Sequence, residues 1–226
     1  MITQELYEKL NAMLTNDQQV GEIVVKLANV RCKIKGKDAI GHLVQEWFFE
    51  WCKKHKYKVL ANAKTQSFPD YFINLPKGGQ SMLEIKNFNI DASPAFDVAD
   101  FYAFVENLPD EVHKLDADYI IFGYKLDSKG NLTIPKLWKK KIWQIVGRSP
   151  TNYITCQIRG ANKDNPRIQK FRPYNFKIED SPNGFNSPIE FLQAIQKLLS
   201  KHKVTKSTYK NWYSSIVESP LFKDSN

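Results

Sequence analysis

The sequence predicts an α/β fold in which helices flank a mixed β-sheet. The first half of the chain shows the order helix, strand, strand, strand, helix, strand, which is typical of such a core. The Pro-Lys-Gly-Gly segment at 76–79 has turn chemistry and predicts an antiparallel hairpin between two of the strands. Residues 118–126 form a nearly continuous apolar run, which predicts a central strand covered on both faces.

Helices are predicted where apolar residues recur at helical spacing. They cover residues 3–14, 38–54, 95–108 and 188–199. The helix at 38–54 carries a wide apolar stripe from Ile40 to Trp51 and ends in a basic cluster, which suits the negative end of a helix dipole. Extended segments are predicted from runs rich in β-branched and aromatic residues. They cover residues 21–34, 57–60, 68–75, 81–88 and 118–126.

The character of the chain changes beyond Leu126. Residues 138–146 interleave lysines with tryptophans, and residues 160–177 are basic, rich in Asn and Pro, and typical of a loop. The last predicted helix is followed by a basic tail at 201–210.

Composition limits the class of protein. The 226 residues suit one domain, and 42% hydrophobic with 13% aromatic residues can fill a core, so the chain is not expected to be disordered. A formal net charge of +9 favours a polyanionic partner, because each phosphate contact releases counterions. The sequence starts without an apolar signal core and contains no run long enough to cross a bilayer, so a cytoplasmic protein is expected.

The main candidate for a catalytic motif is Pro69-Asp70, followed across the predicted turn by Glu84-Ile85-Lys86. Asp70 opens one strand of the hairpin, and Glu84 lies in the next. Because Glu84 and Lys86 are two positions apart, their side chains share one face of the strand. The sequence therefore predicts a patch of two carboxylates and one ammonium group.

Such a patch suits the hydrolysis of a phosphate ester. Carboxylates are hard ligands for Mg²⁺, and the metal stabilises charge on the phosphate and helps to generate hydroxide. Lys86 could orient or deprotonate the attacking water. The alternative interpretation is a set of strand-end charges joined by a surface salt bridge.

Together with the preceding helix, this stretch resembles the core of the PD-(D/E)xK nucleases, over about residues 39–126. The resemblance implies a restriction-endonuclease-like core, with Asp70 and Glu84 as Mg²⁺ ligands and Lys86 as the catalytic lysine. In many members the preceding helix adds a glutamate to the active site and the metal. Glu46 is the obvious match and Glu50 the rival, while the alternative for Glu46 is a solvent-facing helix position.

Finer spacing resembles two groups of restriction enzymes. The His-x-Tyr at 55–57 and the Ser-Phe-Pro-Asp at 67–70 are spaced as in EcoRV-like enzymes, although these carry Asp-x-Lys where this chain has Glu84; the class accepts either carboxylate. The Gln-Glu-Trp at 45–47 and the strand start at 115–119 are similar to the NgoBV-like enzymes. The resemblance implies a single endonuclease domain over 1–226, with a catalytic core at about 36–126 and a C-terminal DNA-recognition region at about 127–226.

Several polar side chains are candidates for contact with DNA. The lysines within 138–143 could lie on phosphates, or could be the solvated side of a segment whose tryptophans are core. The run 162–172 gathers Arg, Asn and Gln, which contact guanine and adenine, or it is an ordinary polar surface loop. The candidates are Asn87, Lys139, Lys140, Lys163, Asn165, Arg167, Gln169, Lys170 and Arg172.

Other chemistries lack their motifs. The four histidines and three cysteines are scattered, which argues against a zinc site, a disulfide framework or a histidine-based nuclease. The sequence also has no P-loop and no Gly-x-Ser-x-Gly elbow.

The combined prediction is a type II restriction endonuclease with Mg²⁺ as cofactor, which hydrolyses double-stranded DNA at a short palindromic site. A homodimer is expected, because two-fold symmetry lets one active site serve each strand. A DNA methyltransferase is the expected functional partner, and the bacterial cytoplasm the expected location. Two alternatives stay open: a structure-specific repair or junction-resolving nuclease, and a non-catalytic DNA-binding module.

Overall fold

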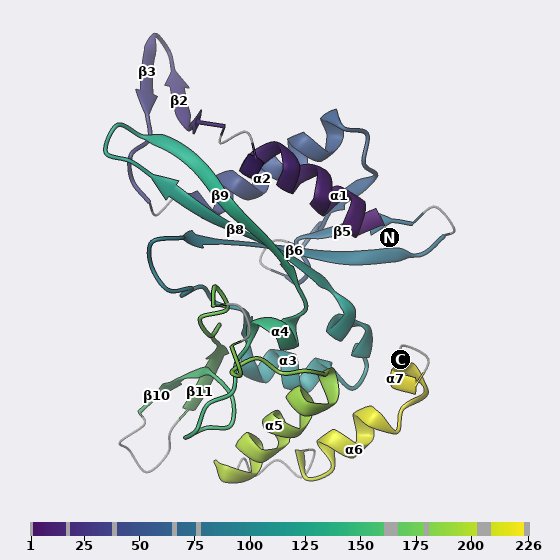
Figure 1. The fold of residues 1–226 in the computed structure, drawn as a ribbon. Helices are drawn as coiled ribbons and strands as arrows, with labels where there is room; N and C mark the ends of the chain where they lie inside the picture. Colours follow the sequence, from purple (N-terminus) through teal and green to yellow (C-terminus); the bar gives the residue numbers. More distant parts are fainter. Residues whose placement is uncertain are drawn as a thin grey trace. The chain divides into compact units, whose positions relative to one another are not determined.

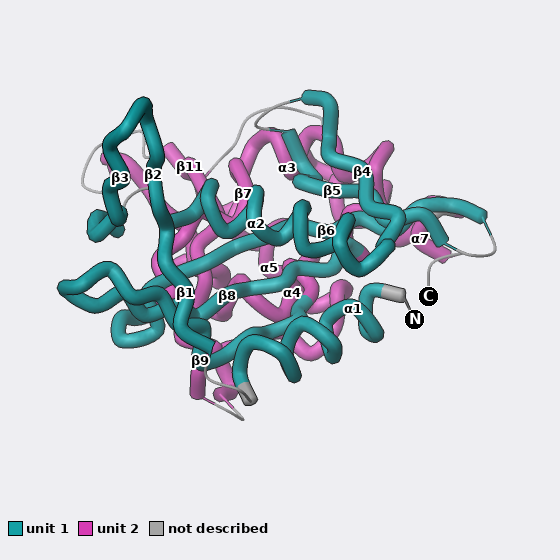
Figure 2. The backbone as a smooth tube through the Cα atoms, turned by 90° about the horizontal axis from the view of Figure 1, so that it is seen from above, with its two compact units in different colours: residues 1–93, 117–140 teal, residues 94–116, 141–226 magenta. Residues whose placement is uncertain are grey.

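The chain folds into two compact units that are each discontinuous in sequence. Unit 1 comprises residues 1–93 and 117–140, and unit 2 comprises residues 94–116 and 141–226 (Figure 2). The computed structural model describes residues 2–16, 19–37, 40–64, 67–75, 78–160, 167–178, 181–202 and 209–223. The predicted division into a catalytic core and a recognition region concerns the roles of these parts and stays a prediction.

Unit 1 is built on a mixed sheet with the strand order β1-β9-β8-β6-β5-β4 (Figure 1). The strands are β1 (Gly21–Glu22), β4 (Val59–Ala61), β5 (Tyr71–Asn74), β6 (Gln80–Asn89), β8 (Asp118–Leu126) and β9 (Asn131–Lys140). The pairing of β6 with β8 is parallel, and the other pairings in this sheet are antiparallel. The mixed sheet flanked by helices confirms the predicted fold class.

The central strand β8 explains the apolar run that marked it in the sequence. Its residues from Asp118 to Tyr124 are all buried, including both the odd and the even positions. Since successive side chains point to opposite faces, burial of both sets means that both faces of β8 are covered. The prediction of a doubly covered strand is therefore confirmed.

Two helices of unit 1 pack with the sheet in one hydrophobic core. They are α1 (Ile2–Asn11), which continues as a π-helical turn η1 (Ala12–Asn16), and α2 (Ile40–Lys54). The buried stripe of α2 repeats at intervals of three and four residues and consists of Ile40, Val44, Phe48, Trp51 and Cys52. Residues 38 and 39, where the sequence predicts the helix to begin, lie outside the described residues.

The hairpin between β5 and β6 is formed as predicted. Tyr71 pairs with Leu83 and Asn74 with Gln80 in antiparallel register. Gly78 and Gly79 have φ values of 90° and 81°, a backbone region that glycine enters without steric penalty. This turn sets the register that brings Asp70 opposite the middle of β6.

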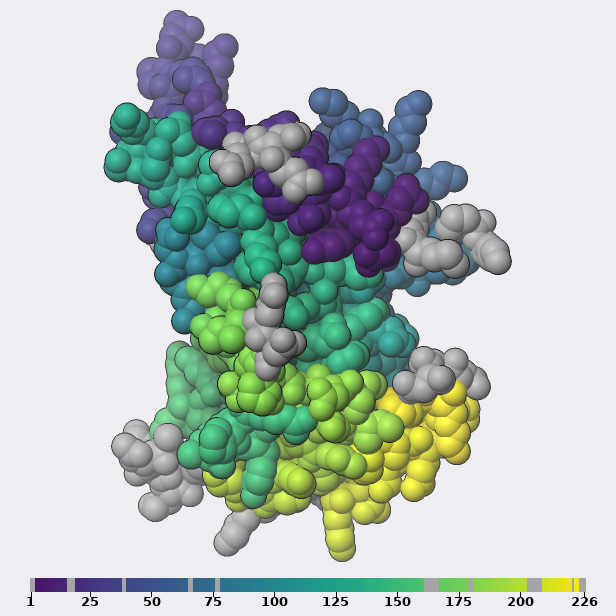
Figure 3. All heavy atoms as spheres, in the orientation of Figure 1, coloured from purple at the N-terminus to yellow at the C-terminus, as the bar shows by residue number. Residues whose placement is uncertain are grey.

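The predicted extended segment at 21–34 becomes β1 and a separate hairpin, β2 (Val24–Leu27) with β3 (Val30–Lys33). Figure 3 shows this hairpin projecting from unit 1, and Val25, Leu27 and Val30 on it are exposed.

Unit 2 combines a small antiparallel sheet with helices. The sheet has the order β10-β11-β7, and its strands are β7 (Ala99–Asp100), β10 (Cys156–Arg159) and β11 (Arg167–Phe171). The helices are α3 (Phe101–Asn107), the 3₁₀ turn η2 (Val112–Asp116), α4 (Ile142–Ile145), α5 (Pro188–Lys201), α6 (Trp212–Val217) and α7 (Pro220–Lys223). The rings of Phe101 and Phe191 lie 5.0 Å and 5.7 Å from that of Phe171, which forms an aromatic core. No helix among the described residues combines the length and apolarity needed to cross a membrane.

Two local predictions in the region of unit 2 are wrong. The helix predicted at 95–108 is restricted to 101–107, because the preceding residues form β7 and the Asp100 side chain caps the helix at Ala103. The loop predicted at 160–177 contains strand β11, whose Ile168 and Phe171 are fully buried. In both cases burial against distant residues overrides the local composition. Residues 203–208 of the basic tail predicted at 201–210 lie outside the described residues, so the tail stays a prediction.

Candidate active site

Asp70 and Glu84 are joined across the β5–β6 hairpin. The main-chain N–H of Asp70 donates to Glu84 Oε2 at 3.0 Å, and the main-chain N–H of Ile85 donates to Asp70 Oδ2 at 2.8 Å. Each carboxylate is thus held by the backbone beside the other. The reciprocal bonds arise because Asp70 precedes β5 directly, where Tyr71 pairs with Leu83.

Lys86 completes the group. Its Nζ lies 2.8 Å from Glu84 Oε1, and the two side chains share a face of β6. The Glu84 side chain is 9% exposed and that of Lys86 is 21% exposed, so the ammonium group lies at the solvent-facing side of the pair. The structure therefore brings together the three residues that the sequence pattern singled out.

A fourth residue reaches this site from α2. The side-chain amide of Gln45 donates to Asp70 Oδ2 at 3.1 Å and to the main-chain oxygen of Ile85 at 3.4 Å. The hydroxyl of Tyr71 donates to the main-chain oxygen of Gln45 at 2.9 Å and ties the helix to β5. Sequence reasoning missed Gln45 as a site residue, although its place beside the buried Val44 puts it at the edge of the sheet-facing stripe.

The two glutamates considered on α2 lie elsewhere. Glu46 is exposed and, in the described part of the chain, no hydrogen bond or ion pair joins it to Asp70 or Glu84. Glu50 forms an exposed ion pair with Lys53 at 2.7 Å. Within the same residues no three His, Cys, Asp or Glu side chains gather as a metal cluster. A role for Glu46 in the active site stays a prediction.

The electrostatics of the carboxylate pair follow from burial. Desolvation raises the pKa of Asp70, although the hydrogen bond from Ile85 and the charge of Lys86 oppose this shift. Desolvation likewise raises the pKa of Glu84; the Lys86 charge lowers it, and the negative charge of Asp70 adds to the rise. When both carboxylates are ionised, Lys86 offsets only one of the two negative charges.

This arrangement fits a hard divalent cation. The carboxylates of Asp70 and Glu84 offer oxygen ligands. The main-chain oxygen of Ile85 lies beside them, because it accepts from the same Gln45 amide as Asp70 does. Mg²⁺ takes one or two carboxylates together with other oxygens, and its charge would favour the ionised forms that burial disfavours. Asp70 and Glu84 are therefore the side chains suited to hold the metal.

The other candidates in unit 1 lie on neighbouring strands. The Asn87 side chain donates to the main-chain oxygen of Gly41 at 3.4 Å, on the face of β6 opposite Glu84. Lys139 on β9 lies 3.8 Å from Asp118 Oδ1, and burial lowers the pKa of Lys140. Their contact with DNA stays a prediction.

The described candidates in unit 2 fall into two groups, and two further candidates lie outside the described residues. Arg167 is exposed at the start of β11, and Gln169 lies within that strand. Lys170 and Arg172 both form ion pairs with Asp97. Lys163 and Asn165 lie outside the described residues.

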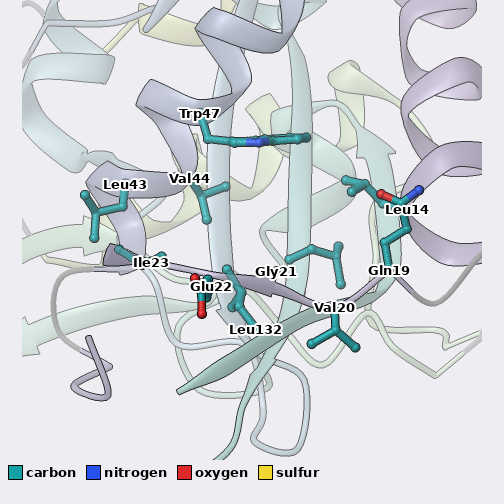
Figure 4. Close-up of a pocket in the computed structure, with 11 residues that line it drawn as sticks. Leu14, Gln19, Val20, Gly21, Glu22, Ile23, Leu43, Val44, Trp47 and Leu132 are labelled. Carbon is teal, nitrogen blue, oxygen red and sulfur yellow. The ribbon is translucent and has the colours of Figure 1, made fainter. Parts of the chain in front are cut away.

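A pocket in unit 1 lies apart from all of these residues. It has a volume of about 190 Å³ and is lined by side chains from α2, β1 and β9, with Trp47 along one wall (Figure 4). Its lining is mainly apolar and includes none of the predicted site residues. The group formed by Asp70, Glu84 and Lys86 is therefore the candidate active site.

Comparison with known proteins decides the family. The family described as NgoBV restriction endonuclease matches residues 1–223. The chain belongs to this family. Its membership of the NgoBV family confirms the predicted type II restriction endonuclease, a site-specific deoxyribonuclease, over the two alternatives.

Relatives of the NgoBV family agree with this assignment. The type II restriction enzyme NlaIV of Neisseria lactamica is 31% identical over 225 residues, covering 96% of this chain and 88% of that enzyme. The type II restriction enzyme NgoBV of Neisseria gonorrhoeae is 32% identical over 150 residues, covering 64% of this chain and 82% of that enzyme. A solved structure of the NlaIV restriction endonuclease matches with a TM-score of 0.85 at 30% identity, covering 99% of this chain and 89% of that one.

Proposed function

We propose that this restriction endonuclease uses Mg²⁺ to hydrolyse both strands of duplex DNA at a short palindromic site. The observation that carries the proposal is the pair of buried Glu84 and half-buried Asp70 beside Lys86, held on the hairpin by backbone hydrogen bonds. Asp70 and Glu84 would hold the metal, which supplies charge stabilisation at the phosphate and an activated water.

The residues of the chain have separate tasks in this scheme. The backbone N–H groups of Asp70 and Ile85 and the amide of Gln45 hold the carboxylates in place before DNA arrives. Lys86 orients the attacking water as an ammonium group, or takes the proton of that water when it is in its neutral amine form, and breakage of the bond between phosphorus and the 3′ oxygen leaves a 5′-phosphate and a 3′-hydroxyl. A general base of this kind contributes roughly 10²- to 10⁴-fold to the rate.

The assembly and cellular setting belong to the same proposal. A homodimer would place one site on each strand of a palindrome. A DNA methyltransferase that protects the host site would be the functional partner, and both would act in the bacterial cytoplasm. Asn87, Lys139, Lys140, Arg167, Gln169, Lys170 and Arg172 are the described residues proposed for DNA contact, while Lys163 and Asn165 are proposed from the sequence alone.

The test uses purified wild-type protein and unmethylated phage DNA, with Mg²⁺ and with EDTA. Discrete fragments that require Mg²⁺ are expected from the wild type, and none from the Asp70→Ala and Lys86→Ala variants. Both variants should still bind a duplex that carries the mapped site. Cleavage of branched DNA alone, or salt-sensitive binding without any cleavage, would overturn the proposal.

A further inference from the structure

Strands β10 and β11 in unit 2 form a two-stranded ribbon beyond the point where β11 pairs with β7, at Lys170 and Phe171, and this ribbon carries two arginines side by side. Arg159 and Arg167 are directly paired in the antiparallel register, and both are exposed. Side chains at directly opposed positions lie roughly 5 Å apart at Cβ, and like charges placed there destabilise the strand pair. Folding of the ribbon does not explain this pair, whereas a ligand with acceptor atoms between the two guanidinium groups would offset their repulsion.

The ribbon has one buried face and one polar face. Ile168 and Phe171 are fully buried although they are three positions apart, which a regular strand with a period of two does not allow. A β-bulge explains this burial. Gln157 pairs with Lys170 and Ile158 pairs with Ile168, so Gln169 is an extra residue of β11 at the register shift. Gln169 and Lys170 both point away from the core as a result.

The polar face therefore displays one continuous set of basic and amide side chains. Its members are Gln157, Arg159, Arg167, Gln169 and Lys170.

The cations near this face differ in what they already bind. Asp97 engages Lys170 and lies 2.6 Å from Arg172 Nη1. Arg172 Nη2 also donates to Gln157 Oε1 at 2.9 Å and so fixes the orientation of that amide. Among the described residues, no carboxylate lies within ion-pair distance of Arg159 or Arg167.

We propose that this polar face enters the major groove of the DNA and reads bases there, with Arg159 and Arg167 as its main contacts. A two-stranded ribbon fits the major groove, Arg pairs bidentately with guanine, and Gln pairs with adenine. The bulge keeps Gln169 beside the arginines, while Arg172 acts as a positioning residue for Gln157. This inference rests on the proposed function and adds the element that recognises the site.

The test compares the full-length wild type with the double variant Arg159→Gln/Arg167→Gln. Binding is measured by fluorescence anisotropy in EDTA on a duplex that carries the mapped site and on a scrambled duplex. Each bidentate contact contributes about tenfold or more, so the loss of two base contacts should weaken binding to the site by at least about 100-fold. Binding to the scrambled duplex should weaken much less. The melting temperature should stay the same or rise, because a like-charge pair is removed.

A matched control removes the same charge elsewhere. Lys26 and Lys58 are exposed cations of unit 1, and Lys26→Gln/Lys58→Gln should leave the ratio of the two affinities within about twofold of the wild type. Equal weakening on both duplexes by the ribbon variant, or no weakening, would overturn the proposal.

Two outcomes separate this inference from the proposed function. A wild type that cuts phage DNA with Mg²⁺, together with a ribbon variant of unchanged discrimination, removes the ribbon proposal alone. A wild type that neither cuts nor discriminates between duplexes removes both.

Discussion

At the scale of single residues, the active site depends on how Asp70 is held. One oxygen, Oδ2, accepts from both the Ile85 main chain and the Gln45 amide. Hydrogen bonds to a carboxylate fix its orientation and favour its ionised form, in opposition to the burial that raises its pKa. Gln45 is therefore a positioning residue that acts on the reaction through Asp70.

The neighbouring residues Gln45 and Glu46 allow a direct test of this role. Gln45→Ala should lower the cleavage rate by about tenfold or more and raise the Mg²⁺ concentration needed for half-maximal rate, as loss of groups that orient metal ligands does. Glu46→Ala, one position along the same helix, should leave both quantities within about twofold, since Glu46 is exposed. Steady-state cleavage of a plasmid over a Mg²⁺ series measures both, and the reverse ranking would show that Glu46 supplies the helix contribution.

The raised pKa values of Asp70 and Glu84 predict a pH dependence of stability in the absence of metal. A carboxyl whose pKa is raised by folding contributes stability that is complete below its unfolded pKa, near about 4, and that is lost as pH rises through the folded value. In EDTA, Asp70→Asn should therefore gain stability relative to the wild type as pH rises above about 4, by at most about 1.4 kcal/mol per pH unit.

Urea unfolding at a series of pH values measures this difference. Asp91→Asn is the control, because the Asp91 side chain is 63% exposed and forms a surface ion pair with Lys125. A difference between Asp70→Asn and the wild type that does not change with pH would contradict the raised pKa.

At the scale of elements, strand β8 shows how tightly the sheet that bears the site is packed. A Cβ placed on Gly123 would lie 2.8 Å from Trp138 Cζ3 and 3.0 Å from Ile90 Cδ1. The Trp138 ring is itself stacked on Phe88 at 5.5 Å, so it cannot move aside freely. The glycine thus allows close approach between β8 and its neighbours.

Gly123→Ala should destabilise the protein by roughly 1–3 kcal/mol, as overpacking of a filled core does. Gly36→Ala is the matched control, because no atom of the described residues lies within 4 Å of the added Cβ, and its effect should stay within about 0.5 kcal/mol. Chemical unfolding with both variants measures the two values. Equal stability of the two variants would contradict this prediction and would mean that the Trp138 side chain shifts to make room for the added methyl group.

At the scale of the whole molecule, the net charge of +9 favours association with DNA, and the proposed two-fold assembly would allow both strands to be cleaved. A duplex attracts such a protein before any base is read, and the attraction weakens as salt rises. Cleavage of both strands in one encounter then requires two active sites related by symmetry.

Light scattering of the Asp70→Ala variant on a duplex that carries the mapped site should give the mass of two chains per duplex. In parallel, the logarithm of its association constant for scrambled DNA should fall linearly with the logarithm of salt concentration. The slope of this line should be about −0.9 for each phosphate contacted. A single chain on the duplex at saturating protein would exclude the homodimer.

Much of the fold and the central group of the site could be predicted from the sequence, because both depend on short-range patterns. Alternation places Glu84 and Lys86 on one face of a strand, the Gly-rich turn returns Asp70 to that face, and unbroken apolar character marks β8 as central. Similar local reasoning located α2, but its predicted apolar stripe from Ile40 to Trp51 is buried only in part, because Trp47 within it is 42% exposed.

Only the tertiary structure decided which residue of α2 reaches Asp70, because Gln45 and Glu46 differ by one step of helical rotation that composition does not resolve. It also decided that 167–171 is a strand with a polar face, since Ile168 and Phe171 become buried through packing with distant segments. Pairing with Asp97 likewise separates Lys170 and Arg172 from Arg159 and Arg167, which look alike in the sequence. The physical reason is that burial and ion pairing join residues far apart along the chain, whereas strand alternation and turn geometry are local.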